Sequence, residues 1–313
     1  MIKTVQDNKM TGVVAELTDL IAMQRQACMV RYRPDSHATR AGNHLSKLRG
    51  RGMNFSETRN YQAGDEIRHM EWRVTARTGR PHVKVFQEER ERPVVILTDF
   101  NPSMYFGTRI AFKSVVAARL AALIAWTAAK QGDRVGGIVF SAVAHNEFTP
   151  RSRQSGVLPI LAALSHYSYE HNPQSKRMPD SRSLSHALLR LRRVAKPGSI
   201  LVLISDFYNL DSDSEQHLSR LSRHNDILAY HVCDPIELTP PKPAQYAITN
   251  GQQELLLDTT LDAVRFSYQF YCEQRISTLQ AQCKRLHVQY IPVTAQTDLP
   301  QLVRQTFPWR RGG

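Results

Sequence analysis

From residue 93 onward, short continuous apolar runs alternate with longer segments whose apolar residues recur at helical spacing. The runs VVILTDF and SILVLISDF are apolar almost throughout, as are the strand-like pieces in DRVGGIVFSA and DILAYHVCDP. Strands that are buried on both faces have this pattern, whereas strands with one solvated face alternate. Apolar strands separated by helices predict a doubly wound α/β domain with a mostly parallel sheet over residues 93–313.

The first 92 residues have a different pattern. The segment TGVVAELTDLIAMQRQACMVRYR places its apolar residues at broadly helical spacing. The stretch that follows is rich in glycine, arginine and polar residues, with short β-like pieces such as HVKVF and too few apolar residues for a large core of its own. We expect an amphipathic helix and a small, basic, β-rich auxiliary domain within residues 1–92.

Residues 235–260 interrupt the alternation of strands and helices. The segment begins rich in proline and then carries AQYAITNGQQELLLD, in which Asn250 and Gly251 lie between two apolar pieces. Asn-Gly is a strong signal for a tight hairpin turn, because both residues tolerate a positive φ. We therefore expect a β-hairpin here that packs on the auxiliary unit.

Bulk composition is ordinary for a folded protein of 313 residues, with 42% hydrophobic and 22% charged residues. No apolar run approaches the roughly 18 residues of a membrane span, and MIKTVQDNKM lacks the apolar core of a signal peptide. We expect a cytoplasmic protein without a membrane span. Its four cysteines are too few and too scattered for a disulfide framework or a zinc spacing.

Positive charge is concentrated in one part of the chain. The net charge is +13, and residues 25–84 hold 13 lysines and arginines against 5 aspartates and glutamates. Such a segment is either a solvated basic face or a surface that docks phosphates or an acidic protein. The sequence has no zinc finger and no aromatic-rich signature of an RNA-binding sheet, which disfavours a nucleic-acid partner.

Two of the apolar strands end in an acid followed by phenylalanine, at Asp99 and at Asp206. In open α/β sheets, ligands bind beyond the carboxyl ends of the strands, where the strand order reverses. Neither strand is followed by a glycine fingerprint for a dinucleotide, and the chain has no phosphate loop, no G-x-S-x-G elbow and no H-E-x-x-H. The usual signatures of an enzyme are therefore absent from the sequence.

The loop DFNPS places oxygen-bearing side chains at alternate positions after a buried strand, namely Asp99, Asn101 and Ser103. This D-x-N-x-S resembles the D-x-S-x-S of the von Willebrand factor A fold, whose metal-ion-dependent adhesion site also uses a threonine from a second loop and an aspartate after a later strand. The resemblance implies a Mg²⁺ site with Asp206 as the later aspartate. Hydroxyl and carboxylate oxygens suit Mg²⁺, and an open position would accept a partner's carboxylate.

The preceding segment, RNYQAGDEIRHMEWRVTARTGRPHVKVFQEE, is similar to the signature of the domain-of-unknown-function 58 family, and DPIELTPP and LLLDTT extend the similarity. Members of that family are regarded as partners of MoxR-type AAA+ ATPases. The resemblance implies a non-enzymatic adaptor or cofactor of such an ATPase, which helps to assemble or mature an unknown client protein. The residues that carry the signature are Arg59, Tyr61, Gly64, Asp65, Arg68, Trp72, Ala76 and Arg77.

The second loop departs from the family pattern G-G-T-x-L-x-x-A-L. Aligning DSRSLSHALL on its leucines and alanine puts Arg182 where threonine belongs, with Ser181 and Ser183 beside it as possible ligands. A guanidinium can pair with a carboxylate and neutralise the charge that Mg²⁺ would neutralise. Three interpretations stay open: a Mg²⁺ site, a degenerate site in which Arg182 replaces the cation, or simple loop capping by Asp99 and Ser103.

The signature segment also has two interpretations. In the first, Trp72 and Tyr61 anchor the small β unit, Gly64 and Asp65 form a turn, and the arginines pair with nearby glutamates. In the second, the segment docks an acidic partner surface. The candidate partner-binding residues are Arg59, Tyr61, Asp65, Arg68, Trp72 and Arg77.

A second function is weighed against the adaptor. D-x-N-x-S at the end of the first strand also resembles the loop of haloacid-dehalogenase phosphatases, with Asp99 as nucleophile and Mg²⁺ to neutralise the phosphate. That chemistry needs a second acid two residues on, where this chain has Asn101, and further acids beyond Asp206. We therefore expect no enzymatic activity and keep a Mg²⁺-dependent phosphatase as the alternative.

Overall fold

The computed structural model describes residues 12–29, 53–62, 64–88, 92–169, 182–249 and 254–308. The chain divides into two compact units. The first contains Met1–Tyr32 and Arg92–Trp309, and the second contains Arg33–Glu91 and Arg310–Gly313.

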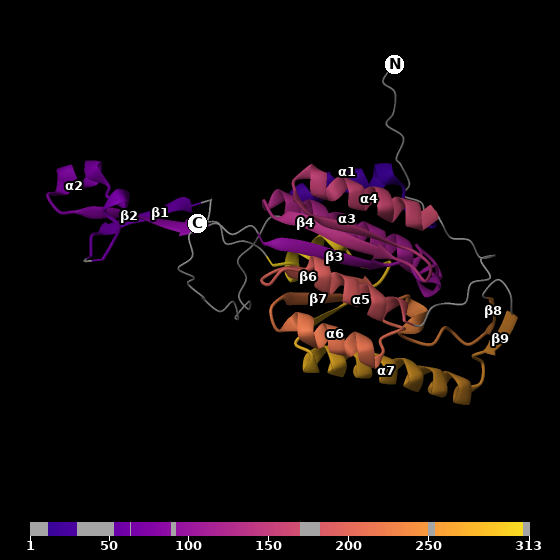
Figure 1. Cartoon of the computed structure of the whole chain (residues 1–313). Helices are drawn as coiled ribbons and strands as arrows, with labels where there is room; N and C mark the ends of the chain where they lie inside the picture. Colours follow the sequence, from indigo (N-terminus) through magenta and orange to yellow (C-terminus); the bar gives the residue numbers. More distant parts are fainter. Residues whose placement is uncertain are drawn as a thin grey trace, which may run out of the picture. The chain divides into compact units, whose positions relative to one another are not determined.

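A central sheet of six strands organises the described part of the first unit (Figure 1). Its order is β10-β7-β6-β3-β4-β5, and all neighbouring strands are parallel except β4 and β5. This confirms the prediction of a mixed α/β fold with a mostly parallel sheet. The strands are β3 (Pro93–Asp99), β4 (Arg134–Phe140), β5 (His145–Ser152), β6 (Ile200–Ser205), β7 (Asp226–Val232) and β10 (Gln289–Val293).

The order of the strands reverses between β3 and β6. From β3 the chain builds outward through β4 to β5, and from β6 it builds the other way through β7 to β10. In the parallel register of the two central strands, Thr98 lies beside Ile204. Asp99 is the last residue of β3 and Asp206 is the first residue after β6, so both lie at the carboxyl ends of adjacent strands. This is the switch point where ligands bind in sheets of this kind.

Helices cover both faces of this sheet, as the sequence predicts (Figure 1). One apolar core lies under the first group of helices and a second core lies under the other group. Among the described residues, no helix is both long and apolar enough to cross a membrane. The first face carries α1 (Leu17–Met29), α3 (Lys113–Lys130), α4 (Gln154–Tyr169) and α8 (Leu299–Thr306), and the other carries α5 (Ser183–Val194), α6 (Ser212–Ser222) and α7 (Asp262–Arg285).

Helix α3 is apolar on nearly all sides because it lies beneath other helices. It packs against α1 and α4 as well as against the sheet. A helix that is hydrophobic all round is one that is buried all round. Its first residue, Lys113, is nevertheless a lysine, and it is 2% exposed.

Helix α1 belongs to the first unit, so our grouping of this helix with the basic segment was wrong. Leu20, Met23 and Ala27 are buried in the core shared with α3. The indole Nε1 of Trp126 donates a hydrogen bond to the carbonyl oxygen of Leu20 at 3.0 Å. The sequence pattern correctly predicts that α1 is amphipathic. The residues that its apolar face packs against, in α3, are about a hundred positions away in the sequence.

The segment after β7 forms the predicted hairpin. Strands β8 (Gln245–Thr249) and β9 (Glu254–Asp258) pair in antiparallel register, while Asn250 and Gly251 lie outside the described residues. The hairpin is part of the first unit. Its packing on the second unit stays a prediction.

In its described residues, the second unit has an antiparallel pair of strands and two short helices. The elements are β1 (Met53–Asn60), η1 (Ile67–His69), α2 (Trp72–Thr78) and β2 (His82–Glu88). The predicted turn is present: Gly64 has a φ of +108°, and the Asp65 carboxylate accepts a hydrogen bond from the Gln62 amide at 2.9 Å. Trp72 is 66% exposed, so the interpretation of this residue as a core anchor was wrong.

Candidate functional site

Asp99 is held by hydrogen-bond donors at the carboxyl ends of the two central strands. The residue is 2% exposed. The Ser205 hydroxyl donates to its Oδ2 at 2.6 Å, and the Asn101 amide donates to its Oδ1 at 2.8 Å. Ser205 in turn accepts a hydrogen bond from the Phe207 amide at 2.9 Å. Both carboxylate oxygens of Asp99 are therefore occupied by hydrogen-bond donors of the chain itself.

Asp206 lies next to this group and pairs with a buried lysine. The Lys113 ammonium donates to Asp206 Oδ2 at 3.0 Å and to Glu237 Oε1 at 2.8 Å. The Lys113 and Asp206 side chains are 3% and 2% exposed, and that of Glu237 is 16% exposed. The other Asp206 oxygen accepts from the Tyr208 amide, and the Ser103 hydroxyl also donates to Asp206.

Glu237 is positioned by a capping box at the end of β7. In the short helix η3 (Pro235–Glu237), the Asp234 amide donates to Glu237 Oε2 at 2.8 Å, while the Asp234 carboxylate accepts from the Ile236 amide at 3.0 Å. Asp234 also accepts from the Thr108 hydroxyl at 2.7 Å. The loop before α3 and the loop after β7 are thereby fixed to each other, which places Lys113 and Glu237 within reach.

The electrostatics of the site follow from burial and from this pairing. Burial, together with the neighbouring Asp206 carboxylate, raises the pKa of Asp99 to about 7. Burial alone would also raise the pKa of Asp206, but the Lys113 ammonium and the hydrogen bonds outweigh it and lower that pKa. Burial works against the charge of Lys113, and Asp206 and Glu237 outweigh it and raise the lysine's pKa. The site thus holds one buried ammonium between two carboxylates.

Of the residues predicted from the motif, Asp99, Ser103 and Asp206 are brought together by the fold. Asn101 is 3% exposed, and its Oδ1 has no hydrogen-bond partner. Ser183 is also buried with its Oγ without a hydrogen-bond partner. Ser181 lies outside the described residues.

The prediction that Arg182 replaces the cation is corrected. Arg182 is exposed at the start of α5. Burial raises the pKa of Asp211, but the hydrogen bonds with Ser214, together with the charge of Arg182, outweigh burial and lower that pKa. The ammonium beside Asp206 belongs to Lys113. A positive charge does neutralise the carboxylates, but it comes from α3 and not from the second loop.

These residues do not fit a Mg²⁺ ion. The oxygens of Asp99 and Asp206 all accept hydrogen bonds, and a lysine ammonium lies where a cation would neutralise Asp206. Across the residues that the structure describes, no group of three or more His, Cys, Asp or Glu side chains could hold a metal. Unlike these carboxylate oxygens, Asn101 Oδ1 is a buried acceptor without a hydrogen-bond partner. Such an acceptor is costly to bury and is free to bind a ligand.

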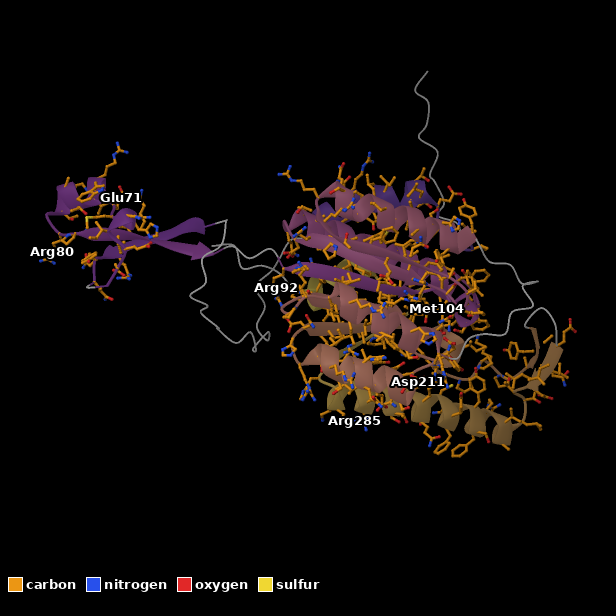
Figure 2. All side chains as sticks on the ribbon, viewed as in Figure 1. Glu71, Arg80, Arg92, Met104, Asp211 and Arg285 are labelled. Carbon is orange, nitrogen blue, oxygen red and sulfur yellow. The ribbon has the colours of Figure 1, made fainter. Side chains whose placement is uncertain are left out.

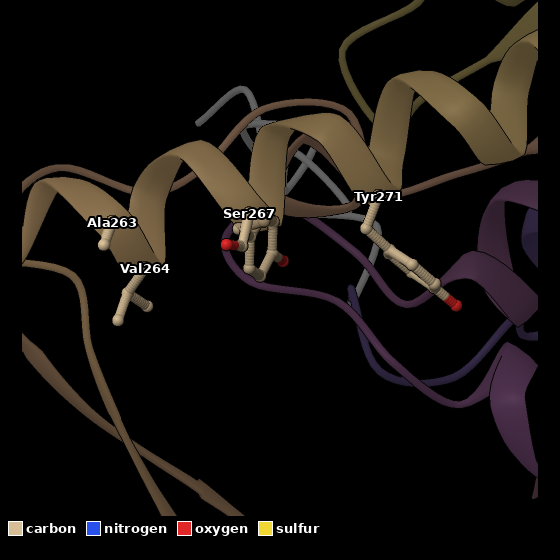
Figure 3. A pocket seen from close by; sticks show the side chains of 5 residues that line it. Ala263, Val264, Ser267 and Tyr271 are labelled. Carbon is tan, nitrogen blue, oxygen red and sulfur yellow. The ribbon is translucent and has the colours of Figure 1, made fainter.

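Exposed aromatic side chains lie beside the buried network. Tyr208 is 49% exposed, and the Arg275 guanidinium lies 3.7 Å from the centre of its ring while donating to the Asp206 carbonyl oxygen at 2.8 Å. Along α7, Tyr271 borders a shallow pocket (Figure 3). The pocket has a volume of about 460 Å³ and is lined by Ala263, Val264, Ser267, Tyr268 and Tyr271.

Asp99 gives a prediction about pH. Its pKa of about 7 in the folded state exceeds its ordinary value of 3.8, so the folded state keeps a proton that the unfolded state loses. The stability that this proton contributes is complete below about pH 4 and is lost as the pH rises through 7. The Asp99→Asn variant cannot ionise. Its free energy of unfolding, relative to wild type, is therefore expected to rise by about 2 kcal/mol between pH 5 and pH 8.

Urea unfolding of both proteins at several pH values in this range measures the difference. The exposed Asp213 on α6 provides the control, because Asp213→Asn removes a carboxylate that is not buried. A stability difference between Asp99→Asn and wild type that stays constant with pH would contradict the assignment.

Comparisons with known proteins agree with the signature segment. The model of the family described as "Protein of unknown function DUF58" matches residues 57–276. Uncharacterized proteins of Mycobacterium bovis and Mycobacterium tuberculosis are 28% identical over 224 residues, which cover 71% of this chain and 68% of each relative.

Two solved structures show a weaker likeness. The conserved hypothetical protein BatB from Bacteroides thetaiotaomicron is 14% identical, with a TM-score of 0.41 over 68% of this chain and 96% of that one. A mutant of the PilB minor pilin from Streptococcus sanguinis is 10% identical, with a TM-score of 0.34 over 74% of this chain and 64% of that one. At these TM-scores neither likeness bears on function.

Proposed function

The chain belongs to the DUF58 family, whose function is unknown, and we propose that it is a non-enzymatic protein-interaction module. In this proposal it is a cytoplasmic adaptor or cofactor of a MoxR-type AAA+ ATPase in the assembly or maturation of other proteins. The first unit is a von Willebrand factor A-like domain with a degenerate metal-ion-dependent adhesion site, and the second is an auxiliary domain. The D-x-N-x-S loop at the switch point of the sheet supports the first of these assignments.

The observation that carries the proposal is that the site at the carboxyl end of the sheet is closed on itself. Each carboxylate oxygen of Asp99, Asp206 and Glu237 accepts a hydrogen bond from the chain. A nucleophile or a general base needs an oxygen that can reach a substrate. Carboxylates that are all engaged internally favour a structural role over turnover.

The phosphatase alternative is supported less well. As a nucleophile, Asp99 would need an ionised, accessible oxygen. The residue is 2% exposed, and both of its carboxylate oxygens accept hydrogen bonds. Its pKa is raised to about 7, which disfavours the ionised form. Asn101 supplies no second acid. We expect that the protein with Mg²⁺ hydrolyses a generic aryl phosphate no faster than its Asp99→Asn variant does. Turnover that the substitution abolishes would favour the phosphatase.

The second unit carries the surface that we assign to a partner. Its described acids have basic neighbours: Asp65 pairs with Arg59 at 2.7 Å, and Glu71 pairs with Lys84 at 2.5 Å. Glu66 lies 3.7 Å from His69. Exposed arginines remain without an ion-pair partner among the described residues. They are Arg68, Arg73, Arg77 and Arg80, and Figure 2 labels Glu71 and Arg80 on this unit.

Apolar side chains accompany these arginines. Trp72 is 66% exposed and begins α2, and Ile67 in η1 is 65% exposed. Tryptophan and arginine are the residues most enriched at the centres of protein interfaces. A unit that exposes both kinds of side chain fits an acidic partner with apolar side chains, which supports the second interpretation of the signature segment. We call Arg68, Trp72, Arg73 and Arg77 the basic face.

Affinity capture tests the proposal. The full chain, used as bait in a lysate of its own organism, is expected to recover an AAA+ ATPase that mass spectrometry identifies. The phosphatase assay runs on the same preparation, so the two functions are separated in one experiment. Repeated capture without any AAA+ ATPase, from baits tagged at either end, would overturn the adaptor.

A further inference from the structure

Lys113 occupies a position that a lysine does not ordinarily hold. It is the first residue of α3 and its side chain is 3% exposed. The amino end of a helix carries partial positive charge, and burial removes the water that stabilises an ammonium. Both effects oppose a charged lysine here. The two carboxylates at 3.0 and 2.8 Å must therefore offset them.

The two carboxylates come from parts of the chain that only the fold brings together. Asp206 follows β6 at the switch point, and Glu237 ends the short helix after β7. Two carboxylates that converge on one point are also what a divalent cation needs, since Mg²⁺ in proteins binds one or two carboxylates and keeps several waters. The Lys113 Nζ marks that point.

The side chain of Asn101 is a third group that suits a cation. Asn101 lies in the loop between Asp99 and Ser103, is 3% exposed, and has an Oδ1 without a hydrogen-bond partner. An amide oxygen is a ligand for hard cations, and the folded chain leaves this one unsatisfied. This observation is independent of the ion pairs themselves.

We infer that Lys113 is a built-in cation that covers a latent divalent-cation site formed by Asp206 and Glu237. Asn101, whose backbone amide binds the neighbouring Asp99, is the candidate third ligand. With lysine in place the site needs no metal. Removal of the ammonium leaves two carboxylates that attract a divalent ion. This inference concerns the isolated chain, so it stands or falls separately from the proposed partner.

Calorimetric titration of the full chain with Mn²⁺ tests the inference. Wild type is expected to show no binding that depends on Asp206. Lys113→Ser removes the ammonium and leaves room, and it is expected to bind one Mn²⁺ about tenfold or more tighter than wild type. Lys113→Ser/Asp206→Asn is expected to lose that gain. Lys130→Ser is the matched control, because Lys130 is an exposed lysine at the other end of α3.

Two results would overturn the inference. One is a folded Lys113→Ser protein that binds Mn²⁺ no tighter than wild type. The other is tight binding of Mn²⁺ by wild type that Asp206→Asn abolishes, because the site would then hold a metal despite the lysine. If Lys113→Ser does not fold alone, its far-ultraviolet circular dichroism is followed as millimolar Mn²⁺ is added. Refolding supports the latent site, and failure to refold counts against it.

Discussion

Replacing Lys113 with methionine is expected to destabilise the folded protein by about 3–5 kcal/mol, the typical effect of removing one partner from a buried ion pair. Methionine keeps much of the length of lysine and removes its charge. Asp206, whose side chain is 2% exposed, would keep a buried carboxylate without its counter-ion, and Glu237 would lose a bond of 2.8 Å. Urea or guanidinium unfolding at pH 7 measures the loss.

Two further variants separate the ion pair from simple packing. Lys130→Met, at the exposed end of the same helix, is expected to change stability by no more than about 0.5 kcal/mol. Lys113→Met/Asp206→Asn removes both charges and is expected to recover part of the loss, because the coupling between buried partners is not additive. A loss below about 1 kcal/mol in Lys113→Met would mean that the carboxylates do not depend on the lysine.

Reversing the charge of the basic face is expected to weaken capture of the ATPase by about a hundredfold or more. The variant Arg68→Glu/Arg73→Glu/Arg77→Glu places three acids where an acidic partner would approach, and like charges in an interface cost several kcal/mol. None of these arginines has an ion-pair partner among the described residues, so the fold of the second unit should survive. Affinity is measured on the purified ATPase that capture identifies.

Matched substitutions on the first unit show whether the loss of ATPase binding is specific to the basic face. Arg193, Arg220 and Arg223 are exposed arginines of the first unit, and their reversal to glutamate changes the net charge equally. That control is expected to keep most of its affinity. Trp72→Ala is expected to cost about 2 kcal/mol of binding, as exposed tryptophans do when they are interface anchors. Unchanged binding by both basic-face variants would remove this surface from the proposal.

Much of the fold could be predicted because its strands have a strong local signal. The runs that became β3 and β6 are apolar except at their carboxyl ends, and nearly every residue in them is buried. Helix α1 shows the limit of this reasoning, since an amphipathic pattern reveals that one face is covered but not what covers it. Trp72 shows another limit: a tryptophan in a small unit was expected to be core, but this unit buries few side chains and leaves it exposed.

The candidate site was only half predictable. Asp99, Ser103 and Asp206 follow from a motif at strand ends. Lys113 was missed because its partner Glu237 lies 124 residues away, and nothing local relates the two. One signal was available: a lysine at the start of a helix that is otherwise apolar must either reach solvent or find a buried acid.

A crystal structure of the full chain grown with Mn²⁺, with an anomalous difference map at the carboxyl end of the sheet, tests the central claim most directly. The account predicts no anomalous peak near Asp99 or Asp206, and the Lys113 ammonium between Asp206 and Glu237 at hydrogen-bonding distance. An anomalous peak bonded to Asp206 and Asn101, with the lysine displaced toward solvent, would contradict it.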